Sequence, residues 1–465
     1  FPFGTLFPGN RKAAERAASG AIMKRINTFF ILLALFLAST AAGEAARNDL
    51  PQPLSVEAAI DYALAHNMAY RAAFEDVSVA GEKLNQAKAD FFPKVDGSYA
   101  FTRLGDQPFI SLPGTTFQRI PFSIQTINRW QVDIIQPLFT GFGLESQYKA
   151  SKVGLKISQY QLEEARLNLM RDVRIAYLQT LLGAKLVEVA RDNVASLEVQ
   201  KKNAEANYRQ GVAAQNDVLK ADVALSEAVQ RERSTVKQLV VLRSTLNQLL
   251  DLDLQEKVEL AGIEERTYQI PDLHQLYSTA EEKRPEYLAV KASIRQAEYS
   301  KTAARSSYYP RVSAFAQYYR EGENFTADNN PYANNYNAAV GVRVDWNLFE
   351  GGKTRASELE WEYRLRGIEQ RRDDLLQKIR LQVENALEQL KVTKANIDTT
   401  RVAVEQAEEN DRITTLQYKE QVVIFLEVLN AQVFLAQTRA DFYQSIYGYE
   451  IAKAELERAI GGTIN

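Results

Sequence analysis

Four short segments of the chain alternate apolar and polar residues with a period of two. In the clearest segment, residues 335–346, every second side chain is apolar: Tyr336, Ala338, Val340, Val342, Val344 and Trp346. This period places the apolar side chains on one face of a β-strand. Weaker alternation predicts further strands at about 95–104, 127–138 and 311–320. Strands of about ten residues suit a tilted crossing of a membrane, but an antiparallel sheet with one wet face shows the same alternation.

Two longer segments follow a heptad pattern, in which apolar or small residues step by three and four. The second segment has Leu376, Ile379, Val383, Ala386, Leu390, Thr393, Ile397, Thr400, Val404 and Ala407 on this stripe. An average spacing of 3.5 residues maintained over this many positions predicts a coiled-coil seam. Residues 138–270 and 332–465 contain no proline, which permits long uninterrupted helices. We therefore predict helical hairpins at 143–250 and 350–460, with arms roughly 100 Å long.

The two hairpins are copies of each other. A shift of 210 positions places Leu138-Phe139-Thr140-Gly141 on Leu348-Phe349-Glu350-Gly351 and Tyr208 on Tyr418. Upstream, Phe91-Phe92-Pro93 matches Tyr308-Tyr309-Pro310 with a shift of 217, so the segment between the strands is seven residues longer in the first copy. We expect two repeats, 46–265 and 266–465. Each begins with a helix, at 56–90 and 286–307, that stops before the proline.

The N-terminal region has the layout of a targeting signal. A basic start at Met23-Lys24-Arg25, an apolar run from Phe29 to Ala38 and small residues after it predict a signal peptide over 23–45. Residues 1–22 are interpreted as a non-structural upstream extension. The alternative of a membrane anchor is weak because ten apolar residues are about half of a spanning helix. No other run approaches that length, so no transmembrane helix is expected.

Composition and charge exclude several classes of protein. The chain has no cysteine, so it has no disulfide, no thiolate metal site and no cysteine nucleophile. Removing residues 1–42 takes away five basic residues and one acidic residue, so the net charge changes from −3 to −7, which argues against a nucleic-acid partner. His66 and His274 are isolated from acidic partners at metal-ligand spacing. We expect no enzyme activity, no cofactor and no metal.

Four strands cannot close a barrel, and open sheet edges cannot sit in lipid. Several chains would therefore contribute strands to one barrel, and the helices would continue it as a cylinder. This geometry alone leaves two, three or four chains open. The competing interpretation is a secreted coiled-coil scaffold or adhesin without a pore, which explains the heptads but not the paired strands.

The duplicated order of helix, Phe-Phe-Pro strand, loop, strand, Leu-Phe-x-Gly and long hairpin resembles the TolC family of bacterial outer-membrane efflux proteins. The run Tyr-Arg-Gln-Gly-Val…Asp-Val-Leu at 208–219 adds to the resemblance, which covers nearly the whole chain after the signal peptide. The resemblance implies an α+β membrane protein: a homotrimer with a 12-stranded barrel, four strands per chain, in the outer membrane of a Gram-negative bacterium. An antiparallel coiled-coil tunnel would extend from it into the periplasm.

In function, the resemblance implies a passive exit duct of a tripartite efflux or type I secretion system. Its partners would be outer-membrane lipid, a periplasmic adaptor protein and an inner-membrane pump or ABC transporter. A mixed equatorial region near 255–285 and the C-terminus would surround the tunnel.

The resemblance also implies two sets of functional residues at the hairpin turns. Asp217, Glu427, Tyr418 and Asn430 correspond to the family's periplasmic constriction, and Gly211, Val212, Gln421 and Val422 to the tips that dock the adaptor. Two positions depart from the family pattern: Asn430 replaces a second acidic residue and Val423 a basic one. Asp217 and Glu427 also have a simpler interpretation, as two solvated carboxylates.

Overall fold

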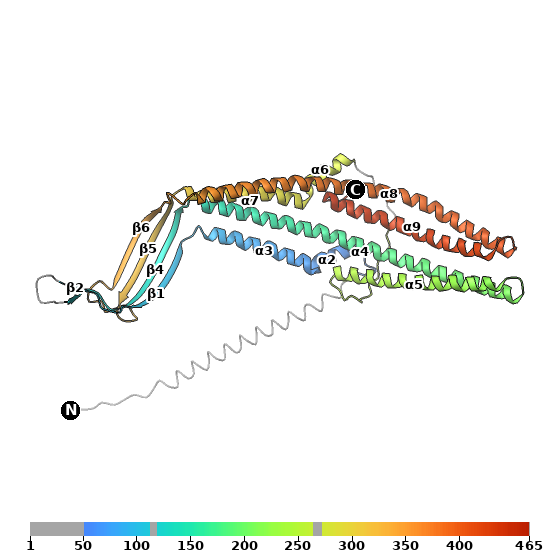
Figure 1. Cartoon of the computed structure of the whole chain (residues 1–465), viewed down its shortest axis with the longest axis horizontal. Coiled ribbons are helices and arrows are strands. Elements are labelled where there is room, and N and C mark those ends of the chain that lie inside the picture. The colour runs from blue at the N-terminus through green and yellow to red at the C-terminus, as the bar shows by residue number, and fades with distance from the viewer. Residues whose placement is uncertain (1–50, 112–118, 264–271, 465) are drawn as a thin grey trace, which may run out of the picture.

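The computed structural model describes residues 51–111, 119–263 and 272–464. The expected extension, the signal peptide and the expected repeat boundary at 265 lie outside the described residues. The chain forms an elongated body with a β-sheet at one end and long helices over the rest of its length (Figure 1).

One antiparallel sheet contains the four strands that the alternation predicts. Its spatial order is β1-β4-β5-β6, so the two strands from each repeat stay adjacent. Each strand begins and ends within two residues of the expected range: Lys94–Arg103 (β1), Thr126–Phe139 (β4), Arg311–Gly322 (β5) and Tyr336–Asp345 (β6). The number and placement of the long strands are therefore confirmed.

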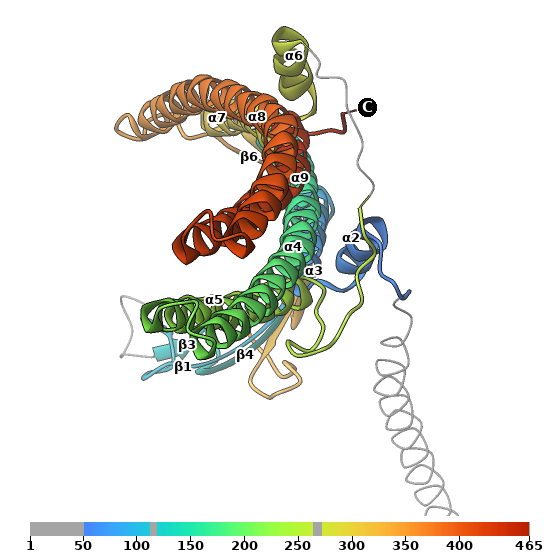
Figure 2. The ribbon, with the colours of Figure 1, turned by 90° about the vertical axis from the view of Figure 1, so that its right-hand side faces the viewer.

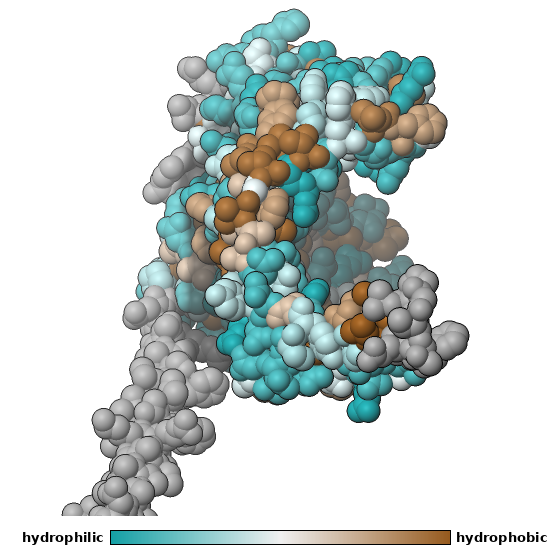
Figure 3. Space-filling view, turned by 90° about the vertical axis from the view of Figure 1, so that its left-hand side faces the viewer, coloured by the Kyte–Doolittle hydropathy of each residue, from teal (hydrophilic) through white to brown (hydrophobic). Residues whose placement is uncertain are grey.

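The register gives this sheet one continuous apolar face. Val340 pairs with Ala316, Ala316 with Ile134, and Ile134 with Val95, so these four side chains lie on the same face. Most other positions of this face are also apolar or aromatic: Tyr99, Phe101, Trp130, Val132, Val312, Ala314, Tyr318, Tyr336, Ala338, Val342 and Val344. Figure 3, which looks at the strand end, shows hydrophobic residues gathered in a band beside hydrophilic surface.

The opposite face of the sheet carries polar and charged side chains that pair across strands. Arg129 Nε donates to Glu321 at 2.8 Å, and Gln317 Nε2 donates to Asp133 Oδ1 at 2.9 Å. The Arg129 guanidinium also lies 5.1 Å from the centre of the Tyr319 ring. An apolar face backed by a paired polar face is the arrangement of a barrel with lipid outside and water inside.

Both edges of this sheet lack a partner strand within the described chain. β1 and β6 are the edge strands, and every residue of β1 is exposed. Unpaired backbone N–H and C=O groups cost several kcal/mol each in a bilayer. The sheet is therefore complete only when neighbouring copies pair with both edges.

The connection between β1 and β4 departs from expectation. The glycine, proline and aspartate residues within 103–126 favour an exposed loop, but this connection contains a two-stranded sheet of Phe109–Ser111 (β2) and Arg119–Pro121 (β3). Ile110 pairs with Ile120 at its centre. Three residues per strand are too few to produce a recognisable alternation, which is why the sequence did not reveal them.

Two hairpins form the helical body. The long arms are Gly143–Arg209 (α4) and Lys353–Lys419 (α8), 67 residues each, and the return arms are Gln215–Leu249 (α5) and Phe425–Ile460 (α9). At 1.5 Å per residue, each long arm spans about 100 Å. Many expected heptad positions are buried, including Val173, Thr180 and Leu197 on α4 and Val383 and Leu390 on α8.

The helix expected over 56–90 is two helices, Val56–His66 (α2) and Met68–Ala89 (α3). Asn67 interrupts them with ψ of 122°, and its side-chain oxygen accepts a hydrogen bond from the Tyr70 N–H at 3.0 Å. The Asn67 amide also donates to the Leu249 carbonyl at 3.0 Å, which fixes the break against the end of α5. The prediction of a single continuous helix was wrong because Asn67 leaves the helical conformation and caps the start of α3 with its side chain, and the periodic pattern on either side does not reveal such a cap.

In the second repeat the corresponding helices are Leu273–Lys283 (α6) and Pro285–Arg305 (α7), and a short 3₁₀ turn, Ser306–Tyr308, follows. Seen from the hairpin tips, the long helices lie along an arc, with α2 and α6 on its outer side (Figure 2). α2 packs into a core with α4 and α5, and α6 into another with α8 and α9. These two cores form a girdle at mid-height and leave both hairpin tips free.

Candidate functional site at the hairpin tips

The two hairpin turns have the same backbone conformation. Gly211 has φ of 72° and Gln421, 210 positions later, has φ of 61°. The N–H groups of Val212 and Val422 donate five residues back, to Asn207 and Gln417, at 2.9 and 2.8 Å. This is a Schellman motif, which satisfies the last carbonyls of a helix and reverses the chain. The turns therefore lie at the positions that the sequence indicated.

Each return arm begins with a carboxylate in its first turn. The Asp217 N–H donates to the Ala214 carbonyl at 3.0 Å, and the Glu427 N–H donates to the Ile424 carbonyl at 3.1 Å. Neither Ala214 nor Ile424 caps its helix with a side chain. An acidic residue in the first turn therefore interacts favourably with the positive end of the helix dipole.

Phe425 joins the two hairpins at their tips. Its side chain is 1% exposed, and it packs in a cluster with Leu197, Ala204 and Ala221 of the first hairpin. Its ring centre lies 5.3 Å from that of Tyr418. The sequence alone did not single out Phe425. The available signal was the difference between the repeats, since the equivalent residue of the first repeat is Gln215 and only the second copy has an aromatic side chain here.

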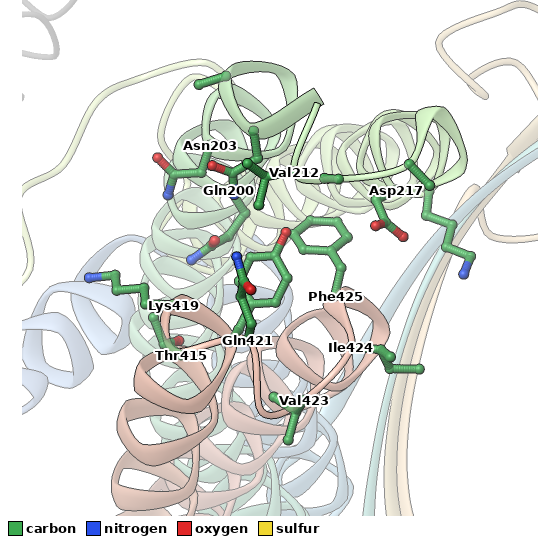
Figure 4. A pocket seen from close by; sticks show the side chains of 16 residues that line it. Gln200, Asn203, Val212, Asp217, Thr415, Lys419, Gln421, Val423, Ile424 and Phe425 are labelled. Atoms are coloured by element: carbon green, nitrogen blue, oxygen red, sulfur yellow. The ribbon is translucent and has the colours of Figure 1, made fainter. Parts of the chain in front are cut away.

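A pocket of about 580 Å³ lies where the hairpins meet, next to Phe425. Figure 4 shows side chains of both hairpins converging on it, with Gln200 and Asp217 from the first and Gln421 and Phe425 from the second. Among the described residues that line it, Asp217 is the one acidic side chain, beside two lysines, Lys220 and Lys419.

The structure separates the residues that the sequence assigned to the tips. Asp217, Tyr418, Val212 and Gln421 all line this pocket. Glu427 and Asn430 are exposed on α9, and Gly211 and Val422 are exposed at the turns, all four outside the pocket lining. Val423, at the position where the family pattern has a basic residue, lines the pocket as an apolar side chain.

The two histidines lie far from this pocket in the sequence and contact aromatic rings. His66 stacks on Tyr62 at 4.0 Å between ring centres, and its Nδ1 lies 2.9 Å from the Tyr62 carbonyl oxygen. His274 meets Tyr277 edge to face. In residues 51–111, 119–263 and 272–464, no three His, Asp or Glu side chains are grouped as metal ligands.

Within the described part of the chain, every helix is too short or too polar to cross a membrane.

Comparison with known proteins agrees with this architecture. The sequence profile of the family described as outer membrane efflux protein matches residues 59–251 and 276–462, one range in each repeat. Outer membrane efflux protein BepC of Brucella suis is 22% identical over 387 residues, covering 83% of this chain and 80% of BepC. Alkaline protease secretion protein AprF of Pseudomonas aeruginosa is 24% identical over 328 residues, covering 69% and 67%.

Solved channel structures share the fold. The CmeC outer membrane channel of Campylobacter jejuni superposes with a TM-score of 0.77 at 16% identity, covering 88% of this chain and 86% of CmeC. VceC of Vibrio cholerae gives 0.74 at 15% identity, covering 88% and 97%. The four-stranded sheet is therefore one third of a trimeric 12-stranded barrel.

The four-stranded sheet, the two hairpins and the family match in both repeats are those of a channel protein. They exclude the alternatives of a secreted scaffold without a pore and of an enzyme. This chain belongs to the outer membrane efflux protein family, as a channel that leads from the periplasm through the bacterial outer membrane.

Proposed function

We propose that the hairpin tips are the periplasmic entrance of the duct, with Asp217 and Glu427 around its opening and both turns docking the adaptor. As a member of its family, the chain works with a periplasmic adaptor and an inner-membrane pump or transporter, which supplies the energy for export. The duct itself is passive. The observation that carries the proposal is the pocket shared by the two hairpins, because relative movement of the hairpins would change its shape.

Exposed apolar side chains at the turns support the docking role. Val422 is 70% exposed, and Val212 and Ile424 are also more than half exposed. Apolar side chains grouped at the end of a long polar rod are typical of a protein-binding surface. The two turns also share one backbone conformation, so one type of partner surface fits both.

Crosslinking in cells tests the docking. Cysteines placed singly at Gly211, Val212, Gln421 and Val422 are the only thiols in the chain, and we expect each to crosslink to the adaptor. Ala100→Cys, on strand β1, is the matched control and should not crosslink. Labelling of the tip cysteines by an impermeant reagent outside the cell would contradict the proposed orientation.

The constriction role follows from charge and symmetry. A trimer brings three copies each of Asp217 and Glu427 to one end of the tunnel, and rings of carboxylates favour cations in a pore. Tyr418 lines the shared pocket beside Phe425, and Asn430 lies one turn beyond Glu427, where it adds a neutral polar group.

Single-channel recording tests this role. The double variant Asp217→Ala, Glu427→Ala should remain a trimer, since each substitution removes a first-turn interaction with the helix dipole of only about 0.3–1 kcal/mol. It should change conductance and weaken block by divalent and trivalent cations added on the periplasmic side. Glu227→Ala, an exposed carboxylate farther along α5, is the control. Unchanged conductance and block in the double variant would show that Asp217 and Glu427 are ordinary surface charges.

A further inference from the structure

A second, smaller cavity lies higher up the hairpins, away from the tips. Its volume is about 40 Å³, and α4, α8 and α9 all contribute to it, so it spans both repeats. Oxygen-bearing side chains make up much of its lining: Asp192, Asn193, Ser196, Asp411 and Gln432.

Two acceptor oxygens in this cavity have no donor within the described part of the chain. They are Asp411 Oδ1 on α8 and Gln432 Oε1 on α9, and both atoms are buried from solvent. Gln432 as a whole is only 7% exposed. A buried polar group left without a partner costs about 1–3 kcal/mol, and more when it is charged. Two such acceptors beside one cavity indicate that a cation or a donor belongs between them.

The internal repeat shows what occupies the equivalent place in the first hairpin. A shift of 210 places Asp411 on Lys201 and Gln432 on Asp222. Lys201 Nζ lies 2.5 Å from Asp222 Oδ1, which joins α4 to α5. The first hairpin thus has an ammonium ion and a carboxylate where the second hairpin has two acceptors. The positive charge that the lysine supplies in one repeat is missing from the matching positions of the other.

The neighbouring arginine does not replace that lysine. Arg439 lines the cavity, but its Nη2 lies 2.8 Å from Glu408 Oε1, and its Nε also donates to that oxygen. Burial raises the pKa of Asp411, and the opposing effect of Arg439 does not cancel this rise. The charged groups at the cavity are therefore Asp192, Asp411 and an arginine already paired with Glu408.

We propose that this cavity binds a hard divalent cation of the calcium type, held by Asp411 and Gln432 and fastening the second hairpin to α4. Calcium takes six to eight oxygen ligands in flexible geometry, including amide oxygens, hydroxyls and water. Asp192, Asn193 and Ser196 offer further oxygens from α4. The cavity has two carboxylates, Asp192 and Asp411, so neutral oxygen ligands would make up the rest of the proposed set. The inference stands independently of adaptor docking and of the constriction.

Calcium binding to the intact trimer tests the site. Purified trimer in detergent is stripped with a chelator, dialysed and titrated with Ca²⁺ alone. We expect one Ca²⁺ per chain and a rise in the thermal midpoint on binding. Asp411→Asn should weaken binding by at least about tenfold, because calcium affinity depends on the charge of the ligand set. Asp398→Asn, an exposed position on the same helix, is the control and should bind as the parent does.

A second variant keeps the test decisive if Asp411→Asn is unstable. Asp411→Lys combined with Gln432→Asp copies the Lys201–Asp222 pair into the second hairpin. It should bind no Ca²⁺, yet melt in chelator at or above the midpoint of the calcium-loaded parent. The proposal is overturned if the parent binds no Ca²⁺, if Asp411→Asn binds it equally well, or if acidification alone reproduces the stabilisation in chelator, which would assign the cavity to water or a proton.

Discussion

At the scale of single residues, the two turns use one backbone conformation but different amino acids. Gly211 suits the left-handed region because it has no Cβ, whereas Gln421 occupies the same region at φ of 61°. An L-residue with a side chain pays about 1–2 kcal/mol for that conformation. The second tip is therefore held in a less favourable conformation than the first.

Exchanging these two residues should have opposite effects on the two tips. Gln421→Gly should stabilise its turn by up to about 1 kcal/mol, or roughly fivefold in local opening. Gly211→Gln should destabilise the first turn by a similar amount. Hydrogen exchange at the amides of Val422 and Val212, which close the two turns, measures both changes. Equal exchange in parent and variants would show that the turns are not strained by their side chains.

At the scale of elements, a buried ionic cluster joins α4, α7 and α9 at the girdle. Arg284 precedes α7 and is 5% exposed, and its Nη2 lies 2.6 Å from Glu286 Oε1. Arg458, near the end of α9, lies 3.0 Å from the same oxygen and donates through Nε to Asn168 of α4 at 2.6 Å. Glu286 is thus the carboxylate that both arginines contact, and Arg458 extends the cluster to the first repeat through Asn168.

Acid should weaken this junction. Burial alone would raise the pKa of Glu286, but hydrogen bonding and charge from Arg284, helped by Arg458, lower it below its ordinary value of 4.5. A lowered pKa in the folded state contributes stability that is complete above about pH 4.5 and is lost as the pH falls through the lower folded value.

Thermal unfolding of parent and Glu286→Gln trimers measures that contribution. At pH 7 the variant should be less stable by about 3–5 kcal/mol, because two buried arginines lose their carboxylate. The difference should shrink below pH 4. Glu298→Gln, an exposed change on the same helix, should match the parent throughout. A difference in stability between parent and Glu286→Gln that stays constant with pH would contradict the role of the Glu286 charge.

At the scale of the whole molecule, the two faces of the sheet meet different solvents. Val342 lies on the apolar face of β6 and is 63% exposed, whereas Ala339 lies on the opposite face of the same strand. In the assembled barrel the first faces lipid and the second faces the water-filled interior.

Placing one arginine on each face separates these environments. Val342→Arg should cost about 2–4 kcal/mol in the folded barrel, as an arginine near the bilayer midplane does. Ala339→Arg should leave folding nearly unchanged and alter ion selectivity. Urea unfolding in lipid vesicles measures the first effect and single-channel recording the second. Equal destabilisation by both changes would contradict the assignment of faces.

The sequence predicted the parts of this fold that depend on long periodic patterns. Alternation in residues 335–346 and the heptad from Leu376 to Ala407 extend over many residues, so packing and pattern agree. The break at Asn67 and the short pairing of Ile110 with Ile120 depend on one side chain or a few backbone contacts, which periodicity does not register. The insertion of Phe425 between the hairpins depends on tertiary packing, and so does the separation of Asp217 from Glu427 across the tip. Neither follows from a pattern within one helix.

The matched lengths of the long helices have a consequence for how such a duct can evolve. α4 and α8 have 67 residues each, so the two tips end level. An insertion in one arm alone would stagger the mouth by 1.5 Å per residue and rotate the seam by 100°. Tunnel length can therefore change without staggering the mouth only through matched insertions in all four arms that keep each seam facing its partner. The seven extra residues of the first repeat lie instead between its strands, where no other arm has to match their length.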